Sequence, residues 1–215
     1  CLMAEPHTVA DWVKHMQAAV DIPVTVKHRI GIDDFDSYEF MVDFVEKVAA
    51  AGCMRFIVHA RTAWLQGLSP KQNREIPPLR YDDVYRLKQD FPALDIEING
   101  GIETVADIKA HLQHIDGVMI GRAFYHNSYL LAEANSLWGA PSPKRSDILA
   151  KLYPYLEEQV AKGEALPTMT RHYLGLFQGL MGARRWRQAL SGKPQLTIDD
   201  IKRAAAEVLA LNPEA

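Results

Sequence analysis

Four sites along the N-terminal part of the chain carry side chains or turns that can bind a ligand. They are Lys27, His59, the Asn99-Gly100-Gly101 turn, and Gly121 with Arg122. A buried lysine can hold the electron-rich edge of a flavin ring and stabilise negative charge there, but a salt-bridged lysine at the rim of a sheet fits equally well. A histidine can donate to a ring carbonyl or transfer a proton, although a structural histidine is the more common case.

Two of the four sites are glycine turns that can accept a phosphate group. Asn99, Gly100 and Gly101 precede a predicted helix, where free backbone amides can receive an anion and glycines let it approach closely. Gly121 stands beside a cation, Arg122, and paired loops of this kind hold phosphates in many barrels. Each feature alone is common, but four successive strand ends with Lys, His, NGG and GR rarely arise by chance.

The elements that position these sites alternate between strands and helices. The alternation predicts an α/β fold with a parallel sheet, in which the ends of the strands form the working face. Four such units could close only half of an eight-stranded barrel, so either the sheet stays open or earlier units are missing. The predicted strands are 22–27, 54–59, 95–98 and 116–120, and the predicted helices are 8–20, 37–52 with Ser37 as the N-cap, 81–90 and 103–113.

The sequence changes character after Trp138, where Gly139 to Pro143 form a predicted linker. Residues 1–143 hold 13 Lys and Arg against 19 Asp and Glu, whereas residues 144–215 hold 11 against 8, so the C-terminal part is the basic part. We expect two domains, 1–138 and 139–215, of which the second is a helical bundle. Its predicted helices are 147–160, 167–179, 183–190 and 197–209, with Ser146 or Asp147 and Thr197 as N-caps.

Composition excludes several classes of protein. The chain is 48% hydrophobic and 24% charged, which argues against disorder, and its formal net charge of −3 argues against a bulk polycation. Two cysteines are too few for a disulfide framework, and no apolar run approaches the length of a membrane span, so we expect no membrane association and a cytoplasmic protein. His111 and His114 are three apart but lack a third ligand, so we interpret them as surface histidines and expect no metal.

Four segments of the chain resemble the tRNA-dihydrouridine synthases, specifically their A-type subfamily. They are PVTVKHRIGID, FIVHARTAWLQGLSPKQNREIPPL, INGGIETVADIKAHLQHIDGVMIGRAFY and TRHYLGLFQGLMGARRWRQ. The resemblance covers nearly the whole chain. It implies the later half of a TIM (β/α)8 barrel that binds FMN and uses NADPH to reduce the C5–C6 bond of D-loop uridines, at positions 20 and 20a, in tRNA.

The resemblance also implies roles for individual residues. In the family, the matching lysine and histidine touch the isoalloxazine, and the matching NGG and GR motifs bind the cofactor phosphate. The implied flavin-binding residues are therefore Lys27, His59, Asn99, Gly100, Gly101, Gly121 and Arg122.

A second group of residues resembles the RNA-binding positions of the family. Lys71 and Arg74 match a loop that contacts the substrate RNA, although a solvated charged loop is the simpler interpretation without the family. Arg184 and Arg187 lie three apart on a predicted helix, where they can straddle phosphates, and the resemblance implies tRNA contact for both. Trp186 between them is expected in the core.

The chain departs from the family at its catalytic acid. The family places the proton-donating cysteine in a GCPS motif, which this sequence lacks, and Cys1 matches a second family cysteine instead. We therefore expect no catalytic residue in this chain, a missing N-terminal half of the same protein as its partner, and no activity from the chain alone. The oligomeric state is not predicted.

Two other functional classes remain open from the sequence. A non-catalytic RNA-binding module would keep Arg184 and Arg187 but bind no flavin. A small-molecule flavin barrel resembling the dihydroorotate dehydrogenases would also act on a pyrimidine ring, but it would leave the basic helical tail and the NREIPPL loop without a role.

Overall fold

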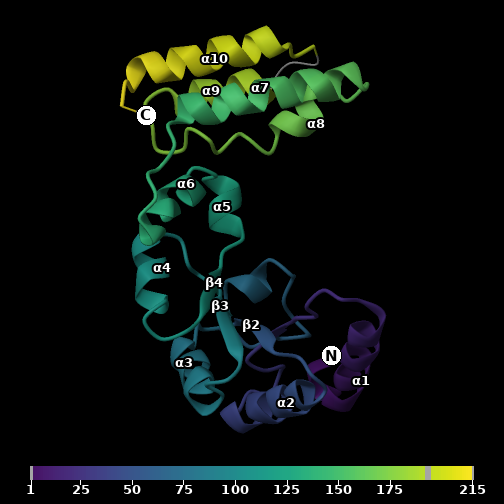
Figure 1. Cartoon of the computed structure of the whole chain (residues 1–215). Coiled ribbons are helices and arrows are strands. Elements are labelled where there is room, and N and C mark those ends of the chain that lie inside the picture. Colours follow the sequence, from purple (N-terminus) through teal and green to yellow (C-terminus); the bar gives the residue numbers. More distant parts are fainter. Residues whose placement is uncertain (1, 192–194, 215) are drawn as a thin grey trace. The chain divides into compact units, whose positions relative to one another are not determined.

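The computed structural model describes residues 2–191 and 195–214, and the contacts between Cα atoms separate two compact units (Figure 1). The first comprises Cys1–Ile102 and Ala106–Ile120, and the second comprises Glu103–Val105 and Gly121–Ala215. The boundary between the units, at Gly121, lies before the linker expected at Gly139. Residues between these two positions contact helices that follow the expected linker. The Arg145 guanidinium, for example, lies 3.5 Å from the centre of the Tyr129 ring.

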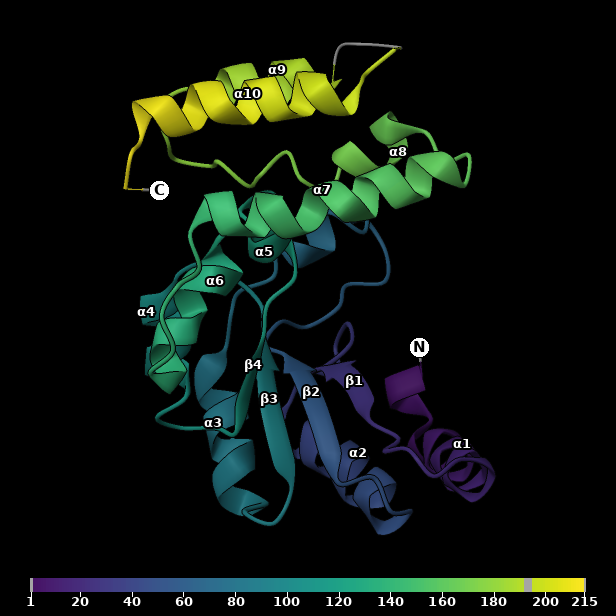
Figure 2. The ribbon, with the colours of Figure 1, turned by 45° about the horizontal axis from the view of Figure 1, so that its top comes forward.

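The first unit is built on a four-stranded parallel sheet with strand order β1-β2-β3-β4 (Figure 2). The strands are β1 (Val26–Arg29), β2 (Arg55–His59), β3 (Asp95–Asn99) and β4 (Gly117–Met119). The register aligns Arg29 with His59, His59 with Asn99, and Asn99 with Met119. The prediction of an α/β fold with a parallel sheet is confirmed.

Helices cover one face of this sheet. The side chains on this face include Phe56, Val58, Ile96 and Ile98, all of which are fully buried. Helices α2 and α3 run along the face (Figure 2). Ser37 caps α2 by accepting a 3.1 Å hydrogen bond from the Phe40 amide, as predicted. The helical elements of this part of the chain are η1 (Leu2–Ala4), α1 (Pro6–Ala19), α2 (Tyr38–Ala50), η2 (Gln72–Arg74), α3 (Tyr81–Asp90) and α4 (Val105–His111).

The first strand begins four residues later than predicted. Ile22 is 71% exposed and Pro23 has no amide to donate to a ladder, so pairing with β2 starts only at Val26. Lys27 is therefore not the last residue of its strand, as the sequence suggested, because the strand continues to Arg29. Since side chains alternate along a strand, Lys27 and Arg29 share one face and His28 lies on the other.

The second unit is helical. Its core includes Leu149, Leu156, Phe177, Trp186 and Ile201, and the Trp186 indole nitrogen donates a 3.1 Å hydrogen bond to the Tyr173 carbonyl. The expectation that Trp186 belongs to the core is confirmed. The helical elements are α5 (Arg122–His126), α6 (Leu130–Ala134), η3 (Asn135–Trp138), α7 (Arg145–Ala161), α8 (Leu166–Thr170), α9 (Ala183–Ser191) and α10 (Ile198–Leu211).

Two details of the helical prediction are wrong. The helix predicted over 167–179 ends at Thr170, and turns follow it. In these turns Gly175 lies so close to the His126 carbonyl that a Cβ there would collide with it. Neither Ser146 nor Asp147 caps α7, which begins at Arg145 without a side-chain cap.

The cap of the last helix is confirmed. Thr197 and Asp200 form a capping box at the start of α10, in which each side chain accepts from the amide of the other residue.

The interpretation of His111 as a surface histidine is also wrong. His111 is only 5% exposed, its Nδ1 lies 2.7 Å from the Tyr85 hydroxyl, and Tyr81 packs edge-on against its ring. Burial lowers the pKa of His111, which favours the neutral ring. His114 is exposed as expected.

Candidate functional site

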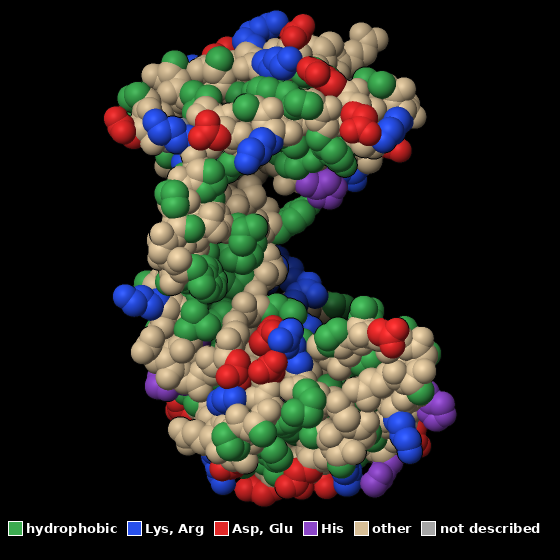
Figure 3. All heavy atoms as spheres, in the orientation of Figure 1, with side chains coloured by type: hydrophobic (Ala, Val, Ile, Leu, Met, Phe, Trp, Pro, Cys, Tyr) green, Lys and Arg blue, Asp and Glu red, His purple; other side chains and the backbone are tan. Residues whose placement is uncertain are grey.

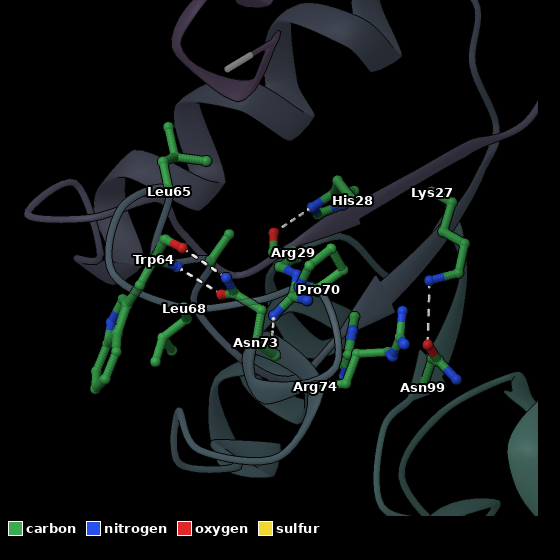
Figure 4. Close-up of a pocket in the computed structure, with 12 residues that line it drawn as sticks. Lys27, His28, Arg29, Trp64, Leu65, Leu68, Pro70, Asn73, Arg74 and Asn99 are labelled. Carbon is green, nitrogen blue, oxygen red and sulfur yellow. Dashed lines mark hydrogen bonds between the residues drawn. The ribbon is translucent and has the colours of Figure 1, made fainter.

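A cavity of about 640 Å³ opens beside the carboxyl ends of β1, β2 and β3 in the first unit (Figure 4). The strands contribute polar side chains to its wall, because the last residues of parallel strands meet at one edge of the sheet. The connection between β2 and α3 contributes the remaining wall. The main lining residues are Lys27, Arg29, His59, Asn99, Asn73 and Arg74, with Trp64, Leu65 and Leu68 as apolar lining.

Lys27 is held in this cavity by Asn99. The Lys27 Nζ atom donates a 3.1 Å hydrogen bond to Asn99 Oδ1, and the Asn99 amide donates a 2.8 Å hydrogen bond to the Met119 carbonyl. Solvent reaches Lys27, but surrounding protein removes part of the hydration of its amine. This loss of hydration, together with the charge of Arg29, lowers the pKa of Lys27.

The cavity carries an excess of positive charge. Lys27, Arg29 and Arg74 line it, and among the lining residues that the structure describes none is Asp or Glu. Burial, with the nearby charges of Arg61 and Arg74, lowers the pKa of Arg29. The three positive charges repel one another, and no carboxylate among the described lining residues offsets them. The cavity therefore suits an anionic or electron-rich ligand.

His59 and the glycine turn are packed against each other. His59 is 8% exposed, and a Cβ added to Gly100 would lie 2.6 Å from its Cδ2 atom and 2.9 Å from its Nε2 atom. Gly100 and Gly101 have φ angles of +115° and +69°, which glycine adopts most readily. The Tyr81 hydroxyl donates a 2.8 Å hydrogen bond to the Gly100 carbonyl, which fixes the turn.

The connection from Arg61 to Arg80 forms the outer wall and is held by Asn73. The Asn73 side chain accepts a 2.8 Å hydrogen bond from the Trp64 amide and donates a 2.6 Å hydrogen bond to the Trp64 carbonyl. The Asn73 carbonyl also accepts a 2.8 Å hydrogen bond from the Arg29 guanidinium (Figure 4). The loop is therefore tied both to itself and to β1.

The two loop cations that resemble RNA-binding positions occupy different places. Arg74 lines the cavity with Lys27 and His59, whereas Lys71 is exposed at the start of η2 and does not line it. The structure thus brings Lys27, His59, Asn99 and Arg74 together, with Gly100 directly against His59.

The remaining sequence-predicted residues belong to the second unit. Gly121 is the residue before α5, where a Cβ would meet open space, and Arg122 is the first residue of that helix. Arg184 and Arg187 lie on α9, the first exposed and the second partly buried. Arg122 and Arg187 line a second cavity, of about 630 Å³, whereas Arg184 does not.

The structure also identifies site residues that sequence reasoning missed. Arg29 was detectable, because the period of two along a strand places it on the same face as Lys27. Asn73 holds the loop through hydrogen bonds to the Trp64 backbone, which no local sequence pattern predicts. Arg171 lines the second cavity, and it directly follows α8 in a stretch where the sequence predicted that the helix continues to residue 179.

Cys53 is the one cysteine within residues 2–191 and 195–214, and it is buried. Its Sγ atom lies 3.3 Å from the Arg55 carbonyl, and burial raises the pKa of its thiol. These features are typical of a structural thiol rather than a proton donor. Cys1, which the sequence matched to a second family cysteine, lies outside the described residues.

The described residues form neither a metal-binding cluster nor a membrane-spanning helix. No group of three or more His, Cys, Asp or Glu side chains in that part of the chain is arranged to hold a metal ion. Every described helix also falls short of the length and apolar character that a membrane-crossing helix needs.

The sequence is similar to a known protein family and to several of its curated members. A family model described as "Dihydrouridine synthase (Dus)" matches residues 1–207. A protein of Vibrio parahaemolyticus named tRNA-dihydrouridine(20/20a) synthase is 55% identical over 215 residues, covering 97% of this chain and 66% of that protein. Proteins of the same name are 58% identical over 194 residues in Synechocystis sp. and 55% identical over 218 residues in Pseudomonas putida.

The match is extensive on this chain but partial on the relatives. It covers 89% of the chain and 58% of the Synechocystis protein, and 100% of the chain and 62% of the Pseudomonas putida protein. The chain therefore spans less than two thirds of the length of these curated relatives. Because the family model covers almost all of its residues, the chain belongs to the dihydrouridine synthase family.

Proposed function

We propose that the protein takes part in the FMN-dependent reduction of D-loop uridines in tRNA, at positions 20 and 20a, with NADPH as the reductant. The family match and the name shared by the relatives support the reaction and the substrate. The cationic cavity of the first unit, which contains no described carboxylate, supports the flavin.

We further propose that strands β1 to β4 and their helices are later units of a TIM (β/α)8 barrel. The parallel strands follow one another in the order of the sequence, as they do in such a barrel. In this proposal residues 1–138 serve flavin binding and residues 139–215 form a helical tRNA-binding domain.

The observation that carries the flavin assignment is the placement of Lys27 and His59 in one cavity beside the Gly100–Gly101 turn. FMN, when bound, supplies the hydride that a uracil ring needs at one carbon of its C5–C6 bond. Lys27 and His59 would hold the isoalloxazine ring, and Asn99, Gly100, Gly101, Gly121 and Arg122 would hold the phosphate.

The side chains suit these tasks for separate reasons. The Lys27 ammonium lies at a cavity wall without described carboxylates, so it can stabilise negative charge on a ring placed against it. Asn99 fixes where that ammonium points, because its own amide is held by the Met119 carbonyl. The His59 imidazole can donate a hydrogen bond, and its contact with Gly100 limits the positions that the imidazole can adopt.

Four cations are proposed to contact tRNA. Lys71 and Arg74 lie in the loop beside the cavity, and Arg184 and Arg187 lie one turn apart on α9. Arginine and lysine bind phosphates and release counterions from RNA, so these contacts would make binding weaken as salt rises.

Titration of the purified protein with FMN, followed by flavin fluorescence, tests the proposed function. Lys27→Gln should weaken FMN binding at least about tenfold, because a hydrogen bond from a charged group contributes roughly 1.5–3 kcal/mol. Lys14→Gln on α1 changes the charge equally at an exposed position and should bind FMN like the parent protein. A protein that binds tRNA but takes up no FMN would overturn the flavin assignment and favour a non-catalytic RNA-binding module.

A further inference from the structure

The second cavity combines three arginines with an exposed aromatic ring. Arg122, Arg171 and Arg187 line it, and Tyr125 is 54% exposed beside them. All of its lining residues belong to the second unit. We propose that this cavity binds one nucleotide of a single-stranded RNA segment, with the phosphate at Arg171 and Arg187 and the base stacked on Tyr125.

The charge of the cavity suits a phosphodiester. Glu103 is the one acidic side chain among its described lining residues, against three arginines. The Arg171 guanidinium is exposed and forms no ion pair or hydrogen bond with any residue in the described part of the chain. Arg187 donates a 3.2 Å hydrogen bond to Gln178, another lining residue, which directs its guanidinium along the cavity wall.

The aromatic ring suits a base. The Tyr125 ring packs edge-on against the rings of His126 and His172, at centroid distances of 5.9 Å each, and its hydroxyl lies 3.2 Å from His172 Nδ1. These ring contacts restrict the Tyr125 side chain, which remains 54% exposed. A fixed, exposed tyrosine beside arginines is the arrangement that single-stranded nucleic acids use for stacking.

The cavity depends on a close approach of two backbone segments. A Cβ at Gly175 would collide with the His126 carbonyl, so glycine is required for the chain after α8 to pack against the end of α5. The resulting volume of about 630 Å³ falls within the range of roughly 300–1,000 Å³ that is usual for small-ligand sites. On the face that Figure 3 shows, acidic and basic side chains of this unit are interspersed.

This inference rests on the proposed function, because it specifies how the same protein holds RNA, but its test requires no flavin. The probes are a fluorescein-labelled uridine pentanucleotide and an abasic ribose phosphodiester of the same length, and the readout is fluorescence anisotropy with the whole 215-residue protein. Circular dichroism and the Tm of each variant show whether it is folded. FMN titration of the same samples separates a failure of this inference from a failure of the flavin assignment.

Three variants and a control give distinct expectations. Arg171→Gln should weaken both probes and reduce the slope of log affinity against log salt by about 0.7. Tyr125→Leu should weaken the uridine probe at least about fivefold and leave the abasic probe unchanged, whereas Tyr125→Phe should keep the affinity for both. Arg203→Gln on α10 removes the same charge away from the cavity and should bind like the parent protein.

The proposal is overturned if Arg171→Gln binds both probes with unchanged affinity. It is also overturned if Tyr125→Leu weakens the two probes equally, or if Tyr125→Phe loses as much affinity as Tyr125→Leu. In the last case the hydroxyl, and not the face of the ring, would be responsible.

Discussion

The Nζ atom of Lys27 donates a 3.1 Å hydrogen bond to Oδ1 of Asn99, which joins a side chain of β1 to one of β3 across the intervening β2. The orientation of the Asn99 amide is determined by its other end, because the Met119 carbonyl can only accept and therefore requires the NH₂ group. Asn99 thus ties three strands to one another at the edge where the cavity lies. The same contact holds the Lys27 ammonium where surrounding protein removes part of its hydration. Such an arrangement is typical of a binding site rather than of a structure optimised for stability.

Substitution of Gly100 should damage both the turn and the neighbouring imidazole. A Cβ in Gly100→Ala would lie 2.6 Å from His59 Cδ2, and the backbone there has a φ of +115°. We expect the free energy of unfolding, measured with urea, to fall by about 1–3 kcal/mol, and FMN binding to weaken.

Gly67→Ala is the matched control for this change. Gly67 also has a positive φ, of +82°, but a Cβ there would meet no atom within 4 Å. Its substitution should therefore reproduce only the backbone part of the cost and leave FMN binding unchanged. Equal losses of FMN affinity in the two variants would show that contact with His59 is unimportant.

The stability of the protein should depend on pH through His28. His28 is 7% exposed, and burial lowers its pKa to about 4, from an ordinary value of 6.5. Between these values the unfolded chain binds a proton that the folded chain does not, so stability should fall as the pH falls from about 6.5 to 4. The expected loss is about 2–4 kcal/mol, at roughly 1.4 kcal/mol for each pH unit.

The pH dependence can be assigned to His28 by substitution. His28 Nδ1 lies 2.7 Å from the Arg29 carbonyl, and His28→Asn keeps a donor for that carbonyl but cannot titrate. We expect urea unfolding of this variant to change much less between pH 7 and pH 4.5 than that of the parent protein. His15→Asn alters an exposed histidine on α1 and should retain the parent slope. Parallel slopes for the parent protein and His28→Asn would exclude His28 as the cause.

The sequence predicted the site best where local signals and position coincide. His59 ends β2 as expected, and Asn99, predicted to follow the third strand directly, is the last residue of β3, because the Gly100–Gly101 turn marks that boundary clearly. The sequence places Lys27 on the correct strand but at its end, because the apolar run stops there whereas pairing with β2 continues through Arg29.

Other features depended on tertiary contacts that a sequence pattern does not contain. After α8 the chain packs Gly175 against the His126 carbonyl, which is distant in sequence, so the exposure of Arg171 at a cavity could not be deduced from helical spacing. The burial of His111 depends on Tyr81 and Tyr85 from another helix.

Loss of the Asn73 side chain should make the connection from Arg61 to Arg80 open more often. Asn73→Ala removes both hydrogen bonds to the Trp64 backbone, each of which contributes about 0.5–1.5 kcal/mol, but keeps the carbonyl that accepts from Arg29. We expect trypsin to cleave after Lys71 and Arg74 at least about fivefold faster, because cleavage follows the population of the opened loop.

The control for the loop is Gln66→Ala. Gln66 is exposed in the same connection, and the loss of its side chain should leave the rate of cleavage unchanged. If Asn73→Ala is cleaved no faster than Gln66→Ala, the hydrogen bonds to Trp64 do not hold the loop closed.

The double variant Arg184→Ala with Arg187→Ala should weaken tRNA binding and spare FMN. Both arginines lie on α9, and each phosphate contact that is lost should reduce the slope of log affinity against log salt by roughly 0.7–0.9. Lys151→Ala with Arg203→Ala removes the same charge from α7 and α10 and should keep both the affinity and the slope. Because net charge changes equally in the two double variants, only a specific role for α9 can separate them. Equal tRNA affinities at every salt concentration would show that Arg184 and Arg187 contact no phosphate.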